Sequence, residues 1–295
     1  MAGKIQIPDE LKKELPQTPL GKTMAATPIV MTVVATMLAG LASSEMTKAQ
    51  YDRGLAAQLQ SKAGDQWSYF QAKKLRGAVA RNSLEVLAAT VSVPPVDPAV
   101  LSALAPAAQA ALTKAEVPAA APAKLEDDVA AAVQALDQAR PESEVMLALT
   151  NITKEKLDVA LESARQAVLA QDATAKPVNG ALDRLDEKLL KGETVTYRGF
   201  AAARLRYLTA RYDLEARLNQ TVANVYELQV RVLNLRAERH HARSAKFFLG
   251  MLAAQMGVII STFSLAAKKK SLLWGLAAAA GTAAVSFATY VYFCL

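Results

Sequence analysis

Two adjacent histidines, His240 and His241, are the residues whose type most directly raises the question of a metal site. Imidazole nitrogens bind Zn²⁺ and related metals, and a pair of them invites that interpretation. Adjacent positions on a helix, however, point about 100° apart, and no cysteine or carboxylate lies at a ligand spacing from the pair. We therefore predict two solvated histidines close to a membrane surface, and neither a metal nor a cofactor.

A second set of residues could bind nucleic acid through stacked rings and positive charge. It consists of Tyr197, Tyr207, Tyr212 and Tyr226 with Arg198, Arg204, Arg206, Arg211 and Arg217. Acidic residues such as Asp213 and Glu215 interrupt the set, and their negative charge would repel the phosphates of a nucleic acid. We therefore predict helix packing with cation–π contacts and no nucleic-acid partner.

The amide of Gln255 is the only other group in an unusual place, since it lies inside an uncharged apolar segment. Such an amide can bind another membrane helix through a hydrogen bond, and we prefer this to a transport role. The sequence has no phosphate-binding loop, dinucleotide fingerprint, zinc-ligand cluster or nucleophile elbow. We expect a protein that is not an enzyme.

Three segments without Asp, Glu, Lys or Arg are long enough to cross a bilayer: residues 23–44, 247–267 and 271–295. A helix needs about 20 apolar residues to span the hydrocarbon core. The sequence therefore predicts a multi-pass membrane protein in contact with lipid. Because residues 1–22 include Asp9, Glu10 and Glu14, the first span is expected to be an uncleaved anchor and not a signal peptide.

The sidedness of the chain follows from its positive charge. The short basic loop at residues 268–270 and the lysines of the tail at residues 1–22 should remain cytoplasmic, because lysines in short loops resist translocation. Three spans then place residues 45–246 on the other side, which in a bacterial inner membrane is the periplasm. Arg236, Arg239, Arg243 and Lys246 oppose this orientation, but long domains cross largely regardless of charge.

Residues 193–246 are predicted to form one long helix that continues into the second span. From residue 200 to 249 there is neither Gly nor Pro, and strong helix formers dominate. Leu218, Val225 and Val232 repeat every seven residues, and Leu214, Leu228 and Leu235 occupy a second seam. This is coiled-coil patterning, so the helix needs partners from within the chain or from other copies.

Residues 45–93 are predicted to be that helix's partner within the chain. Their apolar residues recur at three- and four-residue steps until Pro94 and Pro95 end the helix. Both helices leave the same face of the membrane, so they should pair antiparallel. The Pro- and Ala-rich residues 94–124 then form a linker whose composition buries too little to order itself unaided.

Residues 125–192 are predicted to be helical, with helices at 126–139 and 142–170 and a short element that begins at Pro177 and ends at Gly192. No strand pattern persists anywhere. The predicted fold is an all-α membrane protein with three transmembrane helices and a long helical-hairpin or coiled-coil extramembrane domain.

Small residues recur at four-residue spacing in the last two spans. The pairs are Gly250 with Ala254, Ala253 with Gly257, Gly275 with Ala279, and Ala277 with Gly281. This spacing lets helices approach closely in lipid. The last two spans should therefore pack tightly against each other. Gln255 lies in the first of these two spans, next to Ala254.

Two segments together resemble a family of bacterial membrane proteins, domain of unknown function 4337. They are Asp65-Gln66-Trp67-Ser68-Tyr69-Phe70-Gln71-Ala72-Lys73, beyond the first span, and residues 268–274, which open the last one. The resemblance implies an N-terminal span, a helical middle and a C-terminal membrane hairpin, and it implies no activity. The aromatic residues of the first segment suggest a packing patch between the two long helices, with a ligand site as the alternative.

These observations favour a non-catalytic, membrane-anchored scaffold or stalk that self-associates. Coiled-coil contacts through Leu218, Val225 and Val232 and close contacts between spans would then join its copies. One alternative is an accessory subunit of a larger bacterial membrane complex, which would bind unlike proteins. The other is an oligomeric channel or transport component, in which replacing Gln255 would change ion flux.

Overall fold

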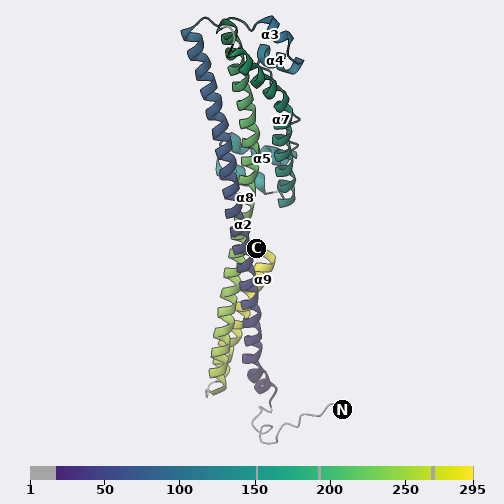
Figure 1. Ribbon diagram of the computed structural model, residues 1–295. Helices are drawn as coiled ribbons and strands as arrows, with labels where there is room; N and C mark the ends of the chain where they lie inside the picture. The colour runs from purple at the N-terminus through teal and green to yellow at the C-terminus, as the bar shows by residue number, and fades with distance from the viewer. Residues whose placement is uncertain (1–17, 151, 192–193, 267–269, 295) are drawn as a thin grey trace, which may run out of the picture. The chain divides into compact units, whose positions relative to one another are not determined.

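The computed structural model describes residues 18–150, 152–191, 194–266 and 270–294, and within these ranges every regular element is a helix (Figure 1). The helices are α2 Pro19–Thr90, α3 Pro98–Ser102, α4 Pro106–Lys114, α5 Asp127–Asp137, α6 Glu142–Leu149, α7 Lys154–Leu189, α8 Thr194–Ala266 and α9 Lys270–Cys294. The predicted all-α fold is confirmed. Most of the predicted N-terminal tail, Gly192, and Lys268 and Lys269 of the basic loop lie outside the described residues.

Two long helices dominate the chain. Helix α2 contains both the first span and the helix predicted to follow it, and α8 continues from Thr194 into the second span as its composition predicts. The chain divides into two compact units: a membrane unit, formed by residues up to Gly54 and from Leu233 onward, and a middle unit, Leu55–Val232. Both long helices contribute to both units.

Within each unit α2 and α8 run antiparallel. In the membrane unit, Ser244 Oγ donates to the carbonyl of Ala42 at 2.7 Å, and His240 Nδ1 lies 2.6 Å from Glu45 Oε2. In the middle unit, Trp67 Nε1 donates to Glu227 Oε1 at 2.6 Å, and Lys74 Nζ to Asp213 Oδ1 at 3.2 Å. Residue numbers on α8 fall as those on α2 rise, which confirms the predicted helical hairpin.

Within the part of the chain that the structure describes, three helices are long and apolar enough to cross a membrane, which indicates a membrane protein. Their inner sides form one cluster of Ala35, Leu38, Ala42, Phe247, Ala254, Ala284 and Val291. Their outer sides carry exposed apolar residues, including Ile29, Val33, Met37, Leu252, Phe263 and Leu276. This distribution suits a bundle whose surroundings are lipid.

The glycines of the membrane unit explain its close packing. A Cβ added at Gly250 would lie 3.2 Å from the carbonyl oxygen of Ala284, and one at Gly257 would lie 3.4 Å from that of Ala277. Helices α8 and α9 therefore approach at small residues, as their spacing predicts. A Cβ added at Gly281 would meet Met31 of α2, so the first span joins this packing. A Cβ added at Gly275 would have open space around it, so this glycine makes no close helix contact.

In the middle unit, α8 is covered by several shorter helices. Its Val225, Leu228 and Val232 belong to a buried cluster with residues of α5, α6 and α7, among them Val129, Val145 and Leu157. A second cluster joins Phe200, Ala203 and Tyr207 of α8 to α4 and α7. Ala63 of α2 meets α7 and α8 in a third. The α8 seam predicted from the sequence is thus filled largely within the chain.

The Pro- and Ala-rich segment contains two short helices and packs against the rest of the middle unit. Ala108, Ala111 and Leu112 of α4 are buried against α7 and α8. The side chain of Gln171, only 2% exposed, donates to the carbonyl of Pro118 at 2.8 Å and accepts from the backbone N–H of Ala120 at 2.9 Å. The segment obtains its order from these neighbours, which composition alone does not reveal.

Two predicted boundaries between residues 125 and 192 are wrong. The helix predicted at 142–170 ends at Leu149, and a new helix starts after Thr153, whose hydroxyl accepts from the backbone N–H of Lys156. Pro177 lies inside α7 and does not begin a separate element. Its ring is on an exposed side, while Val178 and Leu182 are buried on the other, and this packing carries the helix past the missing hydrogen bond.

Candidate functional site

The segment from Asp65 to Lys73 attaches α2 to α8. The Trp67 indole, hydrogen-bonded to Glu227, packs edge-on against Phe70 with ring centroids 5.3 Å apart. Lys73 Nζ donates to Glu215 Oε2 at 2.5 Å and lies 5.8 Å from the ring centroid of Tyr212. These contacts form the packing patch that its aromatic residues predict.

Glu215 is the most enclosed carboxylate of this patch, with 8% of its surface exposed. It accepts from Lys73 through one oxygen and from the Nε of Arg211 through the other, at 2.6 Å. Two cations thus satisfy one buried anion, which removes the penalty of burying an unpaired charge. The arrangement is structural because both oxygens are already engaged.

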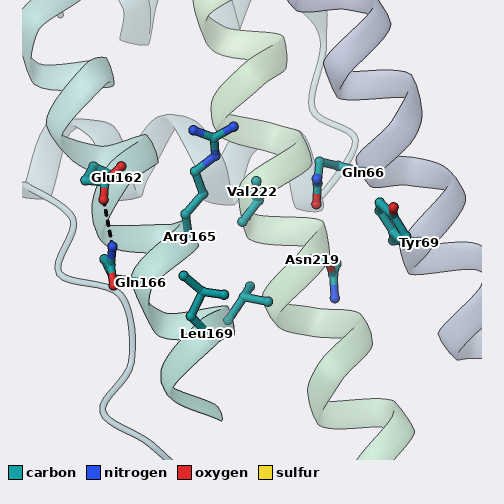
Figure 2. Close-up of a pocket in the computed structure, with 9 residues that line it drawn as sticks. Gln66, Tyr69, Glu162, Arg165, Gln166, Leu169, Asn219 and Val222 are labelled. Atoms are coloured by element: carbon teal, nitrogen blue, oxygen red, sulfur yellow. Dashed lines mark hydrogen bonds between the residues drawn. The ribbon is translucent and has the colours of Figure 1, made fainter. Parts of the chain in front are cut away.

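Asp65 and Gln71 of the same segment are exposed, while Gln66 and Tyr69 line a groove between α2, α7 and α8 (Figure 2). The groove has a volume of about 500 Å³. Its lining is Gln66, Tyr69, Glu162, Arg165, Gln166, Val168, Leu169, Asn219 and Val222. This size and mixture of apolar and amide groups are suited to binding.

Several polar groups of the groove, those on α7 among them, have partners within the chain. Arg165 Nη2 donates to the hydroxyl of Tyr226 at 2.6 Å, and its guanidinium lies 5.6 Å from that ring's centroid. Gln166 donates to Glu162 at 2.8 Å, as drawn in Figure 2. The nine lining residues include no histidine, cysteine, serine or threonine.

His240 is not solvated as predicted, whereas His241 is exposed. The Nδ1 of His240 lies 2.6 Å from Glu45 Oε2, and its Nε2 lies 3.9 Å from Asp52 Oδ2. Both carboxylates come from α2, far away in the sequence, so spacing along the chain could not reveal them. Across the described ranges, no group of three or more His, Cys, Asp or Glu is arranged to hold a metal ion.

Glu45 lies just after the first predicted span. Burial would raise the pKa of its carboxyl, but hydrogen bonds and charge interactions with Lys48 and His240 outweigh burial and hold that pKa below its usual range. Glu45 is therefore a carboxylate at neutral pH. It joins α2 to α8 at the edge of the apolar spans.

The predicted coiled-coil residues on α8 differ in burial. Val225, Leu228 and Val232 are buried by the chain itself, and Leu214, Leu218 and Leu235 are partly buried. A second copy could reach the three buried residues only by opening the core that they share with α5, α6 and α7. The structure thus gives this part of the seam a partner within the chain.

Gln255 is exposed on the outer side of the second span, next to Ala254, which is buried in the bundle. It lines a groove of about 490 Å³ with Thr32, Ala35, Thr36, Ala39, Val258 and Ile259. The hydroxyls of Thr32 and Thr36 donate to carbonyls of their own helix. Among the described residues, the Gln255 amide has no hydrogen-bond partner.

A second seven-residue repeat, which the sequence analysis missed, lies on α2. We call it the outer seam: Ala72, Leu75, Val79, Asn82, Val86 and Ala89, all exposed. Its alternating steps of three and four residues could have revealed it. The outer seam was not recognised because α2 is also apolar on the side that faces α8. The apolar residues of the two sides together were assigned to a single stripe.

The family model for a domain of unknown function, DUF4337, matches residues 20–160. This match confirms the resemblance on the segment from Asp65 to Lys73, and it includes α2 to α6 and the start of α7. Residues 268–274 lie outside the matched range. No curated protein and no solved structure matches the chain.

Proposed function

We propose that this chain, whose residues 20–160 match the DUF4337 family, is a non-catalytic helical scaffold anchored in a bacterial inner membrane, where it associates with further copies of itself. The antiparallel α2–α8 pairing and the three apolar helices support the anchored scaffold. The observation that carries self-association is the unpartnered amide of Gln255 on the outer side of a span.

An amide that faces hydrocarbon without a partner costs several kcal/mol. Helices in membranes satisfy such groups by hydrogen bonds to other helices. Gln255 carries both donors and an acceptor, so the same residue of a second copy can complete its bonds. The small side chains of Ala35 and Ala39 beside it leave room for another helix to approach.

We further propose that the tail and the loop at residues 268–270 are cytoplasmic and that the middle unit is periplasmic. Support comes from the three lysines of that short loop. A cysteine placed at exposed Ala88, in a Cys294→Ser background, should react with a membrane-impermeant maleimide in intact spheroplasts. Reaction only after lysis would place the middle unit in the cytoplasm.

Self-association is tested by purifying the tagged chain from its native membrane in mild detergent and measuring its mass. We expect an integer multiple of 31.4 kDa. Gln255→Leu should shift the mass toward one copy, whereas Met256→Leu, at the neighbouring exposed position, should leave it unchanged. A wild-type mass of one chain, or an unchanged mass for Gln255→Leu, would contradict the proposal.

The groove of Figure 2 favours a second candidate, an accessory subunit of a larger complex. Its apolar lining includes Val168, Val222 and Leu169, and Leu169 is 62% exposed. A partner protein could cover these side chains. Unlike proteins that elute with the chain in a fixed ratio would favour this role over the self-associating scaffold.

A further inference from the structure

We propose that the outer seam of α2 is a docking surface for the outer seam of a second copy, and that the two form a short parallel coiled coil. This inference rests on the proposed self-association and assigns an interface in the middle unit to it. The occupant is the same helix of another chain.

The spacing of the outer seam is that of a two-stranded coiled coil. Ala72, Val79 and Val86 recur every seven residues, and Leu75, Asn82 and Ala89 form the second row. The first row carries two valines and the second row carries one leucine, Leu75, and β-branched residues in the first row with leucine in the second favour two parallel strands. The exposed fractions of Leu75, Val79 and Val86 are 67%, 57% and 54%, although these are the three largest apolar side chains of the seam.

The chain covers the opposite side of the same helix. Ala63, Phe70, Gly77 and Leu84 also recur every seven residues, about half a turn from the outer seam. Ala63 is fully buried, and a Cβ added at Gly77 would lie 3.5 Å from Cβ of Tyr212 on α8. One seam of α2 is thus filled by α8, and the outer seam is left open.

A second copy fits the open seam because the pattern is self-complementary. In every copy α2 begins with the first span, so neighbouring copies in one membrane present this helix in the same direction, as a parallel pair requires. Asn82 would meet Asn82 of the other copy, and a paired amide at one seam position sets the register. A seam this short is marginal for free helices, but anchoring both in one membrane raises their effective concentration.

The test is disulfide cross-linking of the full chain in native membranes, in a Cys294→Ser background. Single cysteines replace Ala72 or Val79 on the outer seam, and the matched control replaces Ala88, which is exposed on another side of α2. A disulfide needs Cβ atoms within about 4.5 Å, so after oxidation we expect about ten-fold more covalent dimer from the seam positions than from the control.

Equal dimer from Ala88→Cys and Val79→Cys, or no dimer at either seam position, would overturn the inference. The mass of each variant in mild detergent separates this failure from failure of the proposed function. An oligomeric mass without seam cross-links means that the copies associate elsewhere. A single-chain mass without cross-links overturns both proposals.

Discussion

Two seven-residue repeats in the middle unit have the same spacing and different surroundings. On α8, Val225 and Leu228 are completely buried by α5, α6 and α7. On α2, Leu75 and Val79 of the outer seam are exposed. The difference shows that a heptad identifies a helix face that needs a partner without identifying the partner. On α8 the later part of the chain is that partner, and on α2 we propose a second copy.

The largest expected effect comes from truncating a buried side chain of the α8 repeat. Leu228→Ala leaves a cavity in a fully buried site and should lower the stability of the middle unit by about 2–5 kcal/mol. Val79→Ala, on the outer seam, should change it by no more than about 0.5 kcal/mol. Amide hydrogen exchange of α5 to α8 in the detergent-solubilised chain measures both. Equal loss of protection would contradict the contrast between the two seams.

On the side of α2 that faces α8, two neighbouring lysines allow a buried contact and an exposed contact to be compared directly. Lys73 pairs with buried Glu215, whereas Lys74 pairs with the more exposed Asp213. Lys73→Met removes a hydrogen bond to a charged, enclosed carboxylate and should cost about 1–3 kcal/mol. Lys74→Met removes a surface pair and should cost less than about 1 kcal/mol. The same exchange experiment would reject this ranking if the two variants behaved alike.

The pH dependence of the membrane unit tests the side of α2 that contacts α8 at Glu45. Because the folded state lowers the pKa of this carboxyl, its stabilising contribution is present above the usual glutamate pKa and is lost as the pH falls through the folded-state value. The unfolding temperature of the wild type in detergent should therefore exceed that of Glu45→Gln at neutral pH, and this difference should disappear at acidic pH. Glu85→Gln, at an exposed position of α2, serves as the control. A constant difference between wild type and Glu45→Gln across pH would refute this assignment.

The smallest effect on the fold is expected at Asn82. Asn82→Leu alters an exposed side chain and should change the stability of one copy by less than about 0.5 kcal/mol. If the outer seam joins two copies, the same change strengthens their association and relaxes its register. Cross-linking through Ala72→Cys should then persist at lower protein levels in the membrane. Weaker cross-linking in Asn82→Leu would count against a coiled coil.

The fold class, the spans and the pairing of α2 with α8 were predictable because they depend on composition, three- and four-residue spacing and chain direction. Side-chain partners were not predictable. His240 and Glu45 lie 195 residues apart, and the sequence around neither residue indicates that the two are paired. Pro177 signals a helix start locally, yet α7 continues through it because Val178 and Leu182 are buried together on one side of the helix. The groove at Gln66 and Tyr69 arises only when three helices meet.

The pairing of α2 with α8 also has a consequence for how the chain is made. The contacts from Trp67 and Lys73 reach residues synthesised 160 and 142 positions later. At a synthesis rate of about 5–20 residues per second, this is a delay on the order of ten seconds. During that time the nascent chain holds α2 without its partner, and non-local pairing of this kind folds slowly. A chain released from the ribosome before α8 is made would leave the side of α2 that packs on α8 exposed. Chaperones and proteases recognise such exposed apolar surface.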